Sequence, residues 1–245
     1  MLHALNADVA RVINASVISM PLPESINTIA RLPEAEKRHH LPIVTSVDFL
    51  PARDGTGPPW HAYDRANQDL KLVCALYDVA FGIMAFAPGD LKGKKIGVPP
   101  RPSSVRVLTE ALLRDGWGIL DDVELVDLRP QEVGPARVQG TSWNLLLEGS
   151  VPLLPNLKGR WLPVSEGAIA AINQANPFKI EGVQAGGTTL LSFKQGLAAW
   201  DSTEESVVVS VLQRLPQATL DWPALSKAHV HPGALQFFKD RAASA

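Results

Sequence analysis

Residues 90–107 read DLKGKKIGVPPRPSSVRV, which is a basic loop, a short apolar strand, a Pro/Ser turn and the start of a helix. The spacing of Val105, Leu108 and Leu112 predicts that one face of this helix is buried. A strand that turns directly into a helix points several backbone N–H groups the same way, which favours anion binding. Arg101 and Arg106 favour the same interpretation, because a guanidinium can hold a carboxylate through two parallel hydrogen bonds. An ordinary strand–helix connection with solvated arginines is the alternative.

Strand-like and helix-like segments alternate along the rest of the chain. Strands are predicted over 12–20, 41–47, 70–86 (two strands, or one with a turn), 95–98, 123–128 and 160–164. Helices are predicted over 3–11, 23–32, 103–114 and 166–173, and after residue 205. This alternation predicts an α/β fold with mostly parallel sheets. We expect two lobes with a ligand cleft between them, lobe one from 1–87 and 184–245 and lobe two from 88–183.

Helix caps and turns are also visible in the sequence. Ser165 is expected to cap the helix that follows it, and residues 202–205 (Ser-Thr-Glu-Glu) have the pattern of a capping box. That second helix should bury the stripe Val208, Val211, Leu212 and Leu215. The Gly- and Pro-rich residues 51–59 predict a loop.

Five stretches, taken in order, carry a resemblance to one protein family: INTIARL at 26–32, GTGP at 55–58, LY at 76–77, the segment 90–106, and HPGALQFFK at 231–239. Together they resemble motifs of the TAXI solute-binding proteins, which serve TRAP-type transporters. The resemblance implies a two-lobed, periplasmic-binding-protein-like fold of type II that closes by hinge motion. It implies a non-catalytic receptor for a small anionic metabolite of the amino or oxo carboxylate class. Its partners would be that carboxylate solute and the membrane subunits of a TRAP-type transporter, with no cofactor.

The resemblance also implies where a solute would bind. The ligand-binding candidates are Arg101, Ser103, Ser104 and Arg106 at the turn, Thr45 and Ser46 after a strand of lobe one, Tyr77, and Gly186 with Thr188 near the return to lobe one. Strand-end capping by the hydroxyls, core packing of the tyrosine and a plain turn at the glycine are the alternatives. Where the family has two glycines, this chain has Pro102 and Ser104, which restrict the close approach of backbone to a ligand.

The start of the chain departs from the family pattern. Family members begin with a strand and a glycine-containing turn. The start of this sequence has no segment that corresponds to them. The first residues also lack the basic and apolar regions of a signal peptide. The resemblance implies a periplasmic protein, so we expect either that a leader is missing from this sequence or that the protein is cytoplasmic.

Composition excludes several other classes of protein. The 245 residues carry a formal net charge of −2 and no basic stripe with aromatics, which argues against nucleic-acid binding. No run reaches the roughly 18–20 apolar residues that cross a bilayer. Cys74, the one cysteine, lies in an apolar run and predicts a buried thiol rather than a reactive one.

Signatures of the common enzyme classes are missing. The sequence has no G-x-S-x-G, H-E-x-x-H, Walker loop or complete G-x-G-x-x-G motif. His39, His40, His61, His229 and His231 could hold a metal, but a solvated loop and a helix start explain them as well. We therefore expect no enzyme and no metal site. The alternatives to a receptor are a cytoplasmic, decarboxylase-like enzyme on the same fold, or a degenerate homologue that binds no solute.

Overall fold

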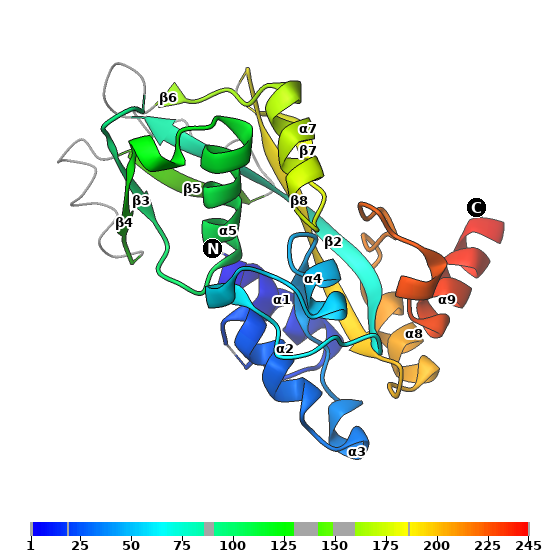
Figure 1. Ribbon diagram of the computed structural model, residues 1–245. Helices are drawn as coiled ribbons and strands as arrows, with labels where there is room; N and C mark the ends of the chain where they lie inside the picture. Colours follow the sequence, from blue (N-terminus) through cyan, green and yellow to red (C-terminus); the bar gives the residue numbers. More distant parts are fainter. Residues whose placement is uncertain are drawn as a thin grey trace. The chain divides into compact units, whose positions relative to one another are not determined.

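The structure of the protein is a computed structural model, which describes residues 2–18, 20–85, 91–129, 142–148, 160–185 and 187–244. The helices are α1 (Leu2–Ile13), α2 (Leu22–Ala30), α3 (Glu34–Lys37), α4 (Phe49–Asp54), α5 (Ser104–Ala111), α7 (Glu166–Ala175), α8 (Glu205–Gln213) and α9 (Pro232–Ala243) (Figure 1). The strands are β1 (Ile43–Thr45), β2 (Leu70–Ala85), β3 (Lys95–Val98), β4 (Glu124–Asp127), β5 (Ser142–Glu148), β6 (Arg160–Trp161), β7 (Glu181–Ala185) and β8 (Thr188–Trp200).

The chain divides into two compact units. Unit 1 comprises Met1–Gly57, Ala62–Tyr77 and Lys194–Ala245, and unit 2 comprises Pro58–His61 and Asp78–Phe193. The long strands β2 and β8 each run from one unit into the other, so both main connections between the units are extended backbone. The expected lobe boundaries at 87/88 and 183/184 stay a prediction.

The described strands form one hydrogen-bonded sheet in the order β1-β8-β2-β5-β3-β4, with β6 beside β2 and β7 beside β8. β3 runs parallel to both β4 and β5. The pairs β1–β8, β2–β5, β2–β6 and β7–β8 are antiparallel. The expectation of parallel strands therefore holds around β3, where a helix follows the strand, whereas the registered pairs of the long strands β2 and β8 are antiparallel.

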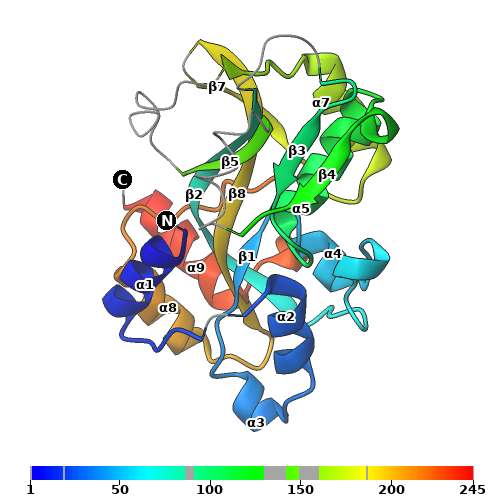
Figure 2. The ribbon, with the colours of Figure 1, turned by 90° about the vertical axis from the view of Figure 1, so that its left-hand side faces the viewer.

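Unit 1 is a layer of strands with apolar clusters on both faces. Successive residues of β8 point to opposite faces, with Ala198 and Trp200 in one cluster and Leu197 and Ala199 in the other. Helices α2 and α4 cover the first face, and α8 and α9 cover the second with α1 packed beside them (Figure 2). The stripe predicted for α8 is confirmed, because Val208, Val211, Leu212 and Leu215 are all buried.

Unit 2 packs two helices against its strands. The face predicted for the helix after β3 buries Leu108 and Leu112 completely, and Val105 is half-buried. After α5 the helix continues as a π-type turn to Gly116. A Cβ on Gly116 would lie 3.2 Å from Ile172 and 3.4 Å from Ala168, so this glycine lets α7 pack closely.

Three local predictions are wrong. Residues 12–20 do not form a strand: α1 extends to Ile13, residues 15–18 are irregular, and Ile18 is 72% exposed. β-branched residues favour a strand only where a neighbouring strand offers a packed surface, and no described strand pairs with this segment. Residues 51–59 are not wholly a loop, because α4 runs to Asp54 and ends at Gly55 in the left-handed conformation.

The capping box at 202–205 is the third wrong prediction. Helix α8 begins at Glu205 with Glu204 at its N-cap and no side-chain cap, so Ser202, the predicted capping residue, lies two positions too early. The hydroxyl of Thr203 donates to the carbonyl of Arg38 and accepts from the N–H of Trp200. By contrast, the cap predicted at Ser165 is confirmed, since its hydroxyl accepts from the N–H of Ala168 over 3.2 Å. No helix among the described residues combines the length and hydrophobicity that crossing a membrane requires.

Candidate functional site

The turn between β3 and α5 has the geometry expected from the sequence. Strand β3 is buried at Ile96 and Val98, and the chain then turns through Pro99–Pro102. Ser103 is extended, with φ −159° and ψ 128°, and its hydroxyl caps no backbone N–H of α5. The first bond into the helix runs from the N–H of Val107 to the carbonyl of Ser103 over 3.0 Å. The N–H groups of the residues before Val107 in α5 therefore lie outside the helical ladder and can receive an anion.

Arg106 is buried in this corner and pairs with two carboxylates. Its Nε donates to Glu110 over 2.9 Å, and its Nη1 donates to Asp127 and to the carbonyl of Pro99. Asp127 lies at the end of β4, so the guanidinium joins β3, α5 and β4. This arrangement gives Arg106 a structural role that sequence spacing did not indicate.

Arg101 shares the carboxylate of Glu110, which accepts from its guanidinium over 3.0 Å. The same guanidinium lies over the ring of Trp60, 4.5 Å from the centroid, and the Arg101 side chain is 47% exposed. Two arginines against Glu110 and Asp127 give the corner a formal charge of zero. The corner therefore offers amide and hydroxyl donors rather than net positive charge.

A second polar group lies in unit 1, where β1 ends. The Thr45 hydroxyl donates to Asp48 over 2.5 Å, and the hydroxyl of Tyr63 donates to the other oxygen of the same carboxylate over 3.0 Å. Burial, with the Asp48 charge beside it, raises the pKa of Tyr63 well above its ordinary value. Tyr63 therefore stays a protonated donor, and Asp48 is a fixed acceptor behind Thr45.

Ser46 connects β1 to the neighbouring strand. Its N–H donates to the carbonyl of Lys194 over 2.8 Å, and its hydroxyl accepts from the N–H of Lys194 over 3.0 Å. The ammonium of Lys194 lies 2.8 Å from the carboxylate of Asp221. The sequence analysis missed Asp48, Lys194 and Asp221 as site residues. The available signals were a lysine inside the apolar run of β8 and an acid three residues after Thr45.

The remaining candidates are spread over both units. Tyr77 is half-buried and packs against the cluster beneath α8 and α9 in unit 1. Thr188 begins β8 in unit 2 and pairs with Ala185 in the β7–β8 hairpin. Because β2 and β5 separate β8 from β3 in the sheet, the hairpin is not adjacent to the β3–α5 turn. Gly186 lies outside the described residues.

Unit 2 also has an open depression of about 530 Å³ between α7 and the β7–β8 hairpin. Its polar side chains bond mostly within the protein: Ser165 caps α7, the Asn173 amide bonds both backbone groups of Ile180, and Gln184 donates to Thr189. These bonds leave few polar groups to recognise a ligand, so the depression is a weaker candidate than the strand ends.

His231 has a structural role at the start of α9. His231 Nδ1 accepts from the N–H of Gly233, which caps α9, and its Nε2 lies 3.1 Å from the carbonyl of Thr203. No group of three or more His, Cys, Asp or Glu side chains with metal-binding geometry occurs within the described residues.

Comparison with known proteins shows which solved structures have a similar fold. No protein-family model matches the chain, and no curated protein sequence matches it. Three of the solved structures similar to the chain illustrate its fold. MatC from Rhodopseudomonas palustris with bound malate has a TM-score of 0.54 and 16% identity, over 96% of this chain and 92% of that one. A structure described as a periplasmic transporter has a TM-score of 0.55 and 16% identity, over 96% and 87%.

The third similar structure is the periplasmic binding protein BugD, with a TM-score of 0.51 and 11% identity, over 97% of this chain and 80% of that one. All three likenesses cover nearly the whole of this chain. Sequence identities of 11–16% establish a similar fold and nothing about function. The chain therefore has the α/β fold of the periplasmic-binding-protein-like class.

Proposed function

We propose that the protein is a solute-binding receptor for a small carboxylate of the amino or oxo carboxylate class. The observation that carries this proposal is the pair of polar strand ends: β1 ends at Thr45 and Ser46, and β3 turns into the open N-terminus of α5. Solute-binding proteins with this fold are among the similar structures, and one of them holds malate. A TAXI-like receptor would pass its solute to the membrane subunits of a TRAP-type transporter, in the periplasm.

The residues of unit 2 have distinct proposed roles. The first-turn N–H groups of α5 and the hydroxyls of Ser103 and Ser104 would bind a carboxylate of the solute. Arg101, which is half-exposed, would add a cation at the edge of the corner. Arg106 would hold the corner in shape through Glu110 and Asp127 and contact the solute only secondarily.

Unit 1 would bind the other end of the solute. Thr45 and Ser46 would present polar groups at the end of β1, with Asp48 fixing the hydroxyl of Thr45. Tyr77 would contribute its hydroxyl from the end of the unit 1 part of β2. The proposal assigns no chemical step to these residues.

The first experiment is mass spectrometry of solutes released from the purified protein, followed by calorimetry against malate, succinate, glutamate, 2-oxoglutarate and acetate. We expect at least one dicarboxylate to bind with a dissociation constant in the micromolar range or below. Ser103→Ala should weaken this binding about tenfold, since it removes one hydrogen bond to a charged group. An empty protein that binds none of the five would contradict the proposal.

A second candidate is a homologue that no longer binds a solute. The neutral corner favours it, because Arg106 and Arg101 are already paired with Glu110 and Asp127. Pro102 and Ser104 favour this candidate as well, because they stand where the TAXI family has glycines and restrict the close approach of backbone to a ligand. The same calorimetry separates the two candidates.

A further inference from the structure

We propose that the outer edge of β1 in unit 1 accepts one further strand, an extended and uncharged segment of a partner polypeptide. Two independent observations support this: backbone groups of β1 without a bonding partner, and an exposed apolar stretch of chain that passes around the same strand. The inference goes beyond the proposed solute-binding function and does not depend on it.

The pairing of β1 with β8 fixes the direction in which each backbone group of β1 points. The N–H of Ser46 donates to the carbonyl of Lys194 over 2.8 Å, and the N–H of Ala198 donates to the carbonyl of Pro42 over 2.9 Å. Hydrogen-bonded pairs alternate with non-bonded pairs along an antiparallel ladder, so residues 42, 44 and 46 face β8. The residues between them direct their backbone groups away from β8.

Ile43 and Thr45 are these outward-facing residues. The carbonyl of Thr45 accepts from the N–H of Asp48 over 3.0 Å. Among the described residues, the N–H and carbonyl of Ile43 and the N–H of Thr45 have no hydrogen-bond partner. Ile43 is only half-buried, so this edge reaches solvent. Two donors and one acceptor at this spacing fit the backbone of one added strand.

The chain between α1 and α2 passes around this edge strand. Ile43 packs with α1 in one apolar cluster, and Val44 packs with α2 in the other. The two helices therefore lie on opposite faces of the sheet, and Figure 2 shows β1 between them. Residues 14–21, here called the connector, must cross from one face to the other around β1, the last described strand on this side of the sheet.

The connector is apolar but exposed. All of its described residues are exposed, including Val17 (44%), Ile18 (72%) and Met20 (36%). Together with Val12, these residues are four of the five large apolar side chains most exposed in the described part of the chain. Clustered exposed apolar side chains are typical of an interaction site. β-Branched residues gain most when they pack against a strand, which an added strand beside β1 would provide.

The other end of the sheet shows how this chain protects an edge that is exposed to solvent. Edge strand β4 carries Glu124 and Asp127, which pair with Lys95 and Arg106. Charged side chains keep an exposed edge from pairing with other strands. Neither β1 nor the connector contains a charged residue, so the edge at β1 lacks this protection.

These features define the occupant. The free backbone groups require an extended chain, and an edge without charges favours β-branched and hydroxyl side chains over charged ones. A second copy of this chain fits less well, because its own β1 is flanked by its own connector and its β4 edge is charged. The added strand therefore comes from a different polypeptide.

The test uses the full chain and a labelled probe peptide, acetyl-Lys-Thr-Val-Thr-Val-Thr-Lys-amide, followed by fluorescence anisotropy. We expect a dissociation constant of about 0.1 mM or below, since few backbone bonds are formed and apolar contacts supply the rest. The same peptide with its three central amides N-methylated keeps the side chains but loses the N–H donors. It should bind at least tenfold more weakly.

Two matched variants test the apolar stretch. Val17→Lys places a charge on the connector and should weaken binding of the probe peptide at least tenfold. Val207→Lys makes the same change on α8, at a side chain with nearly the same exposure, 42% against 44%. It should change the affinity less than twofold. Both sites are exposed, so both variants should fold.

Amide hydrogen exchange followed by NMR tests the edge without any variant. The N–H groups of Ile43 and Thr45 should exchange at least tenfold faster than that of Val44, which faces β8. The probe peptide should slow exchange at Ile43 and Thr45 at least tenfold and leave Val44 nearly unchanged.

Three results would overturn the inference. The first is exchange at Ile43 and Thr45 that is already as slow as at Val44 in the protein alone. The second is a probe peptide that does not bind at about 1 mM, or binds the two lysine variants equally. The third is a dimer in sedimentation that Val17→Lys dissociates, which would make a second copy the occupant. Carboxylate binding is measured separately, so the proposed function stands or fails on its own calorimetry.

Discussion

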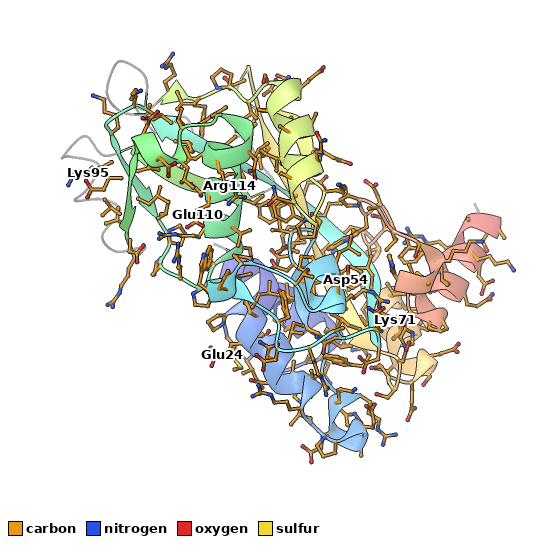
Figure 3. The ribbon with its side chains drawn as sticks, viewed as in Figure 1. Glu24, Asp54, Lys71, Lys95, Glu110 and Arg114 are labelled. Carbon is orange, nitrogen blue, oxygen red and sulfur yellow. The ribbon has the colours of Figure 1, made fainter. Side chains whose placement is uncertain are left out.

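Arg106 and Glu110 form an ion pair of 2.9 Å one turn apart on α5, with side chains only 9% and 13% exposed. Figure 3 shows Glu110 on α5 in unit 2. We expect Arg106→Ala to lower the free energy of unfolding by about 3 kcal/mol, because it removes the buried guanidinium that bonds Glu110, Asp127 and the carbonyl of Pro99 and leaves the largely buried Glu110 to the half-exposed Arg101. Urea unfolding monitored by circular dichroism measures this loss.

The control for Arg106 is another cation between β3 and β4. Lys95 pairs with Glu124 over 3.3 Å, but both side chains are about 60% exposed, and Lys95 lies at the edge of unit 2 in Figure 3. Lys95→Ala should cost less than about 0.5 kcal/mol. A similar small loss for Arg106→Ala would mean that the corner does not depend on its guanidinium.

Gly196 of β8 lies against β2 so closely that no side chain fits. A Cβ at this position would collide with the carbonyl oxygen of Cys74 and would lie 2.8 Å from the ring of Trp222. Gly196→Ala should therefore destabilise the protein by about 3 kcal/mol or more, since either β2 or a core tryptophan must shift. Thermal unfolding should show the change directly.

Gly167 provides the opposite case. It lies in α7, is exposed, and a Cβ there would meet only the Ser165 hydroxyl at 3.9 Å. Gly167→Ala should raise the free energy of unfolding by about 0.5–1 kcal/mol through helix propensity alone. If Gly196→Ala and Gly167→Ala changed the free energy of unfolding equally, β8 would not approach β2 closely at Gly196.

Much of the secondary structure could be predicted because its signals are local. The cap at Ser165 and the buried stripe from Val208 to Leu215 depend on neighbours within two helical turns. The capping box at 202–205 failed because α8 begins at Glu205, two residues later than a cap at Ser202 requires. Thr203, the first helical residue in that prediction, instead donates its hydroxyl to the distant carbonyl of Arg38. Such a competitor, 165 residues away in sequence, leaves no local trace.

The candidate site was harder to predict for the same reason. Spacing placed Arg106 correctly at the start of α5, but Asp127, which pairs with it, lies on the next strand 21 residues later. Lys194 was visible as a charge in an apolar run, yet its meaning depends on Ser46 and Asp221, which meet it only in the folded chain. Residue type indicates which chemistry is available, and tertiary pairing decides which groups remain able to use it.

His231 makes stability depend on pH. Burial lowers its pKa below the ordinary value, and its bond to Thr203 and the nearby Asp201 and Glu205 offset only part of this effect. The unfolded chain therefore binds a proton more readily than the folded one. Stability should be fully present above about pH 6.5, the ordinary histidine value, and should fall as the pH drops from there toward the folded pKa.

The variant His231→Asn tests this dependence, because asparagine can still cap α9. Its free energy of unfolding should fall less steeply between pH 7.5 and 5.5 than that of the unmodified protein. An unchanged slope in His231→Asn would assign the pH dependence to other groups, such as His229, whose pKa burial also lowers.

The rate at which a reagent modifies the Cys74 thiol should measure opening of the fold, because the thiol itself is unreactive in the native protein. It is fully buried in β2, and burial raises the pKa of its thiol to about 12. At pH 8 its thiolate fraction is about a thousandfold below that of an ordinary cysteine, so a disulfide reagent should modify the native protein at a rate set by opening of the sheet. In urea the reagent should modify one thiol per chain, since the sequence has one cysteine.

Gly196→Ala, which forces β8 away from Cys74, should accelerate labelling of the Cys74 thiol in native buffer at least tenfold, in step with its loss of stability. Immediate labelling of the unmodified native protein would mean that β2 is not enclosed by the two apolar clusters of unit 1.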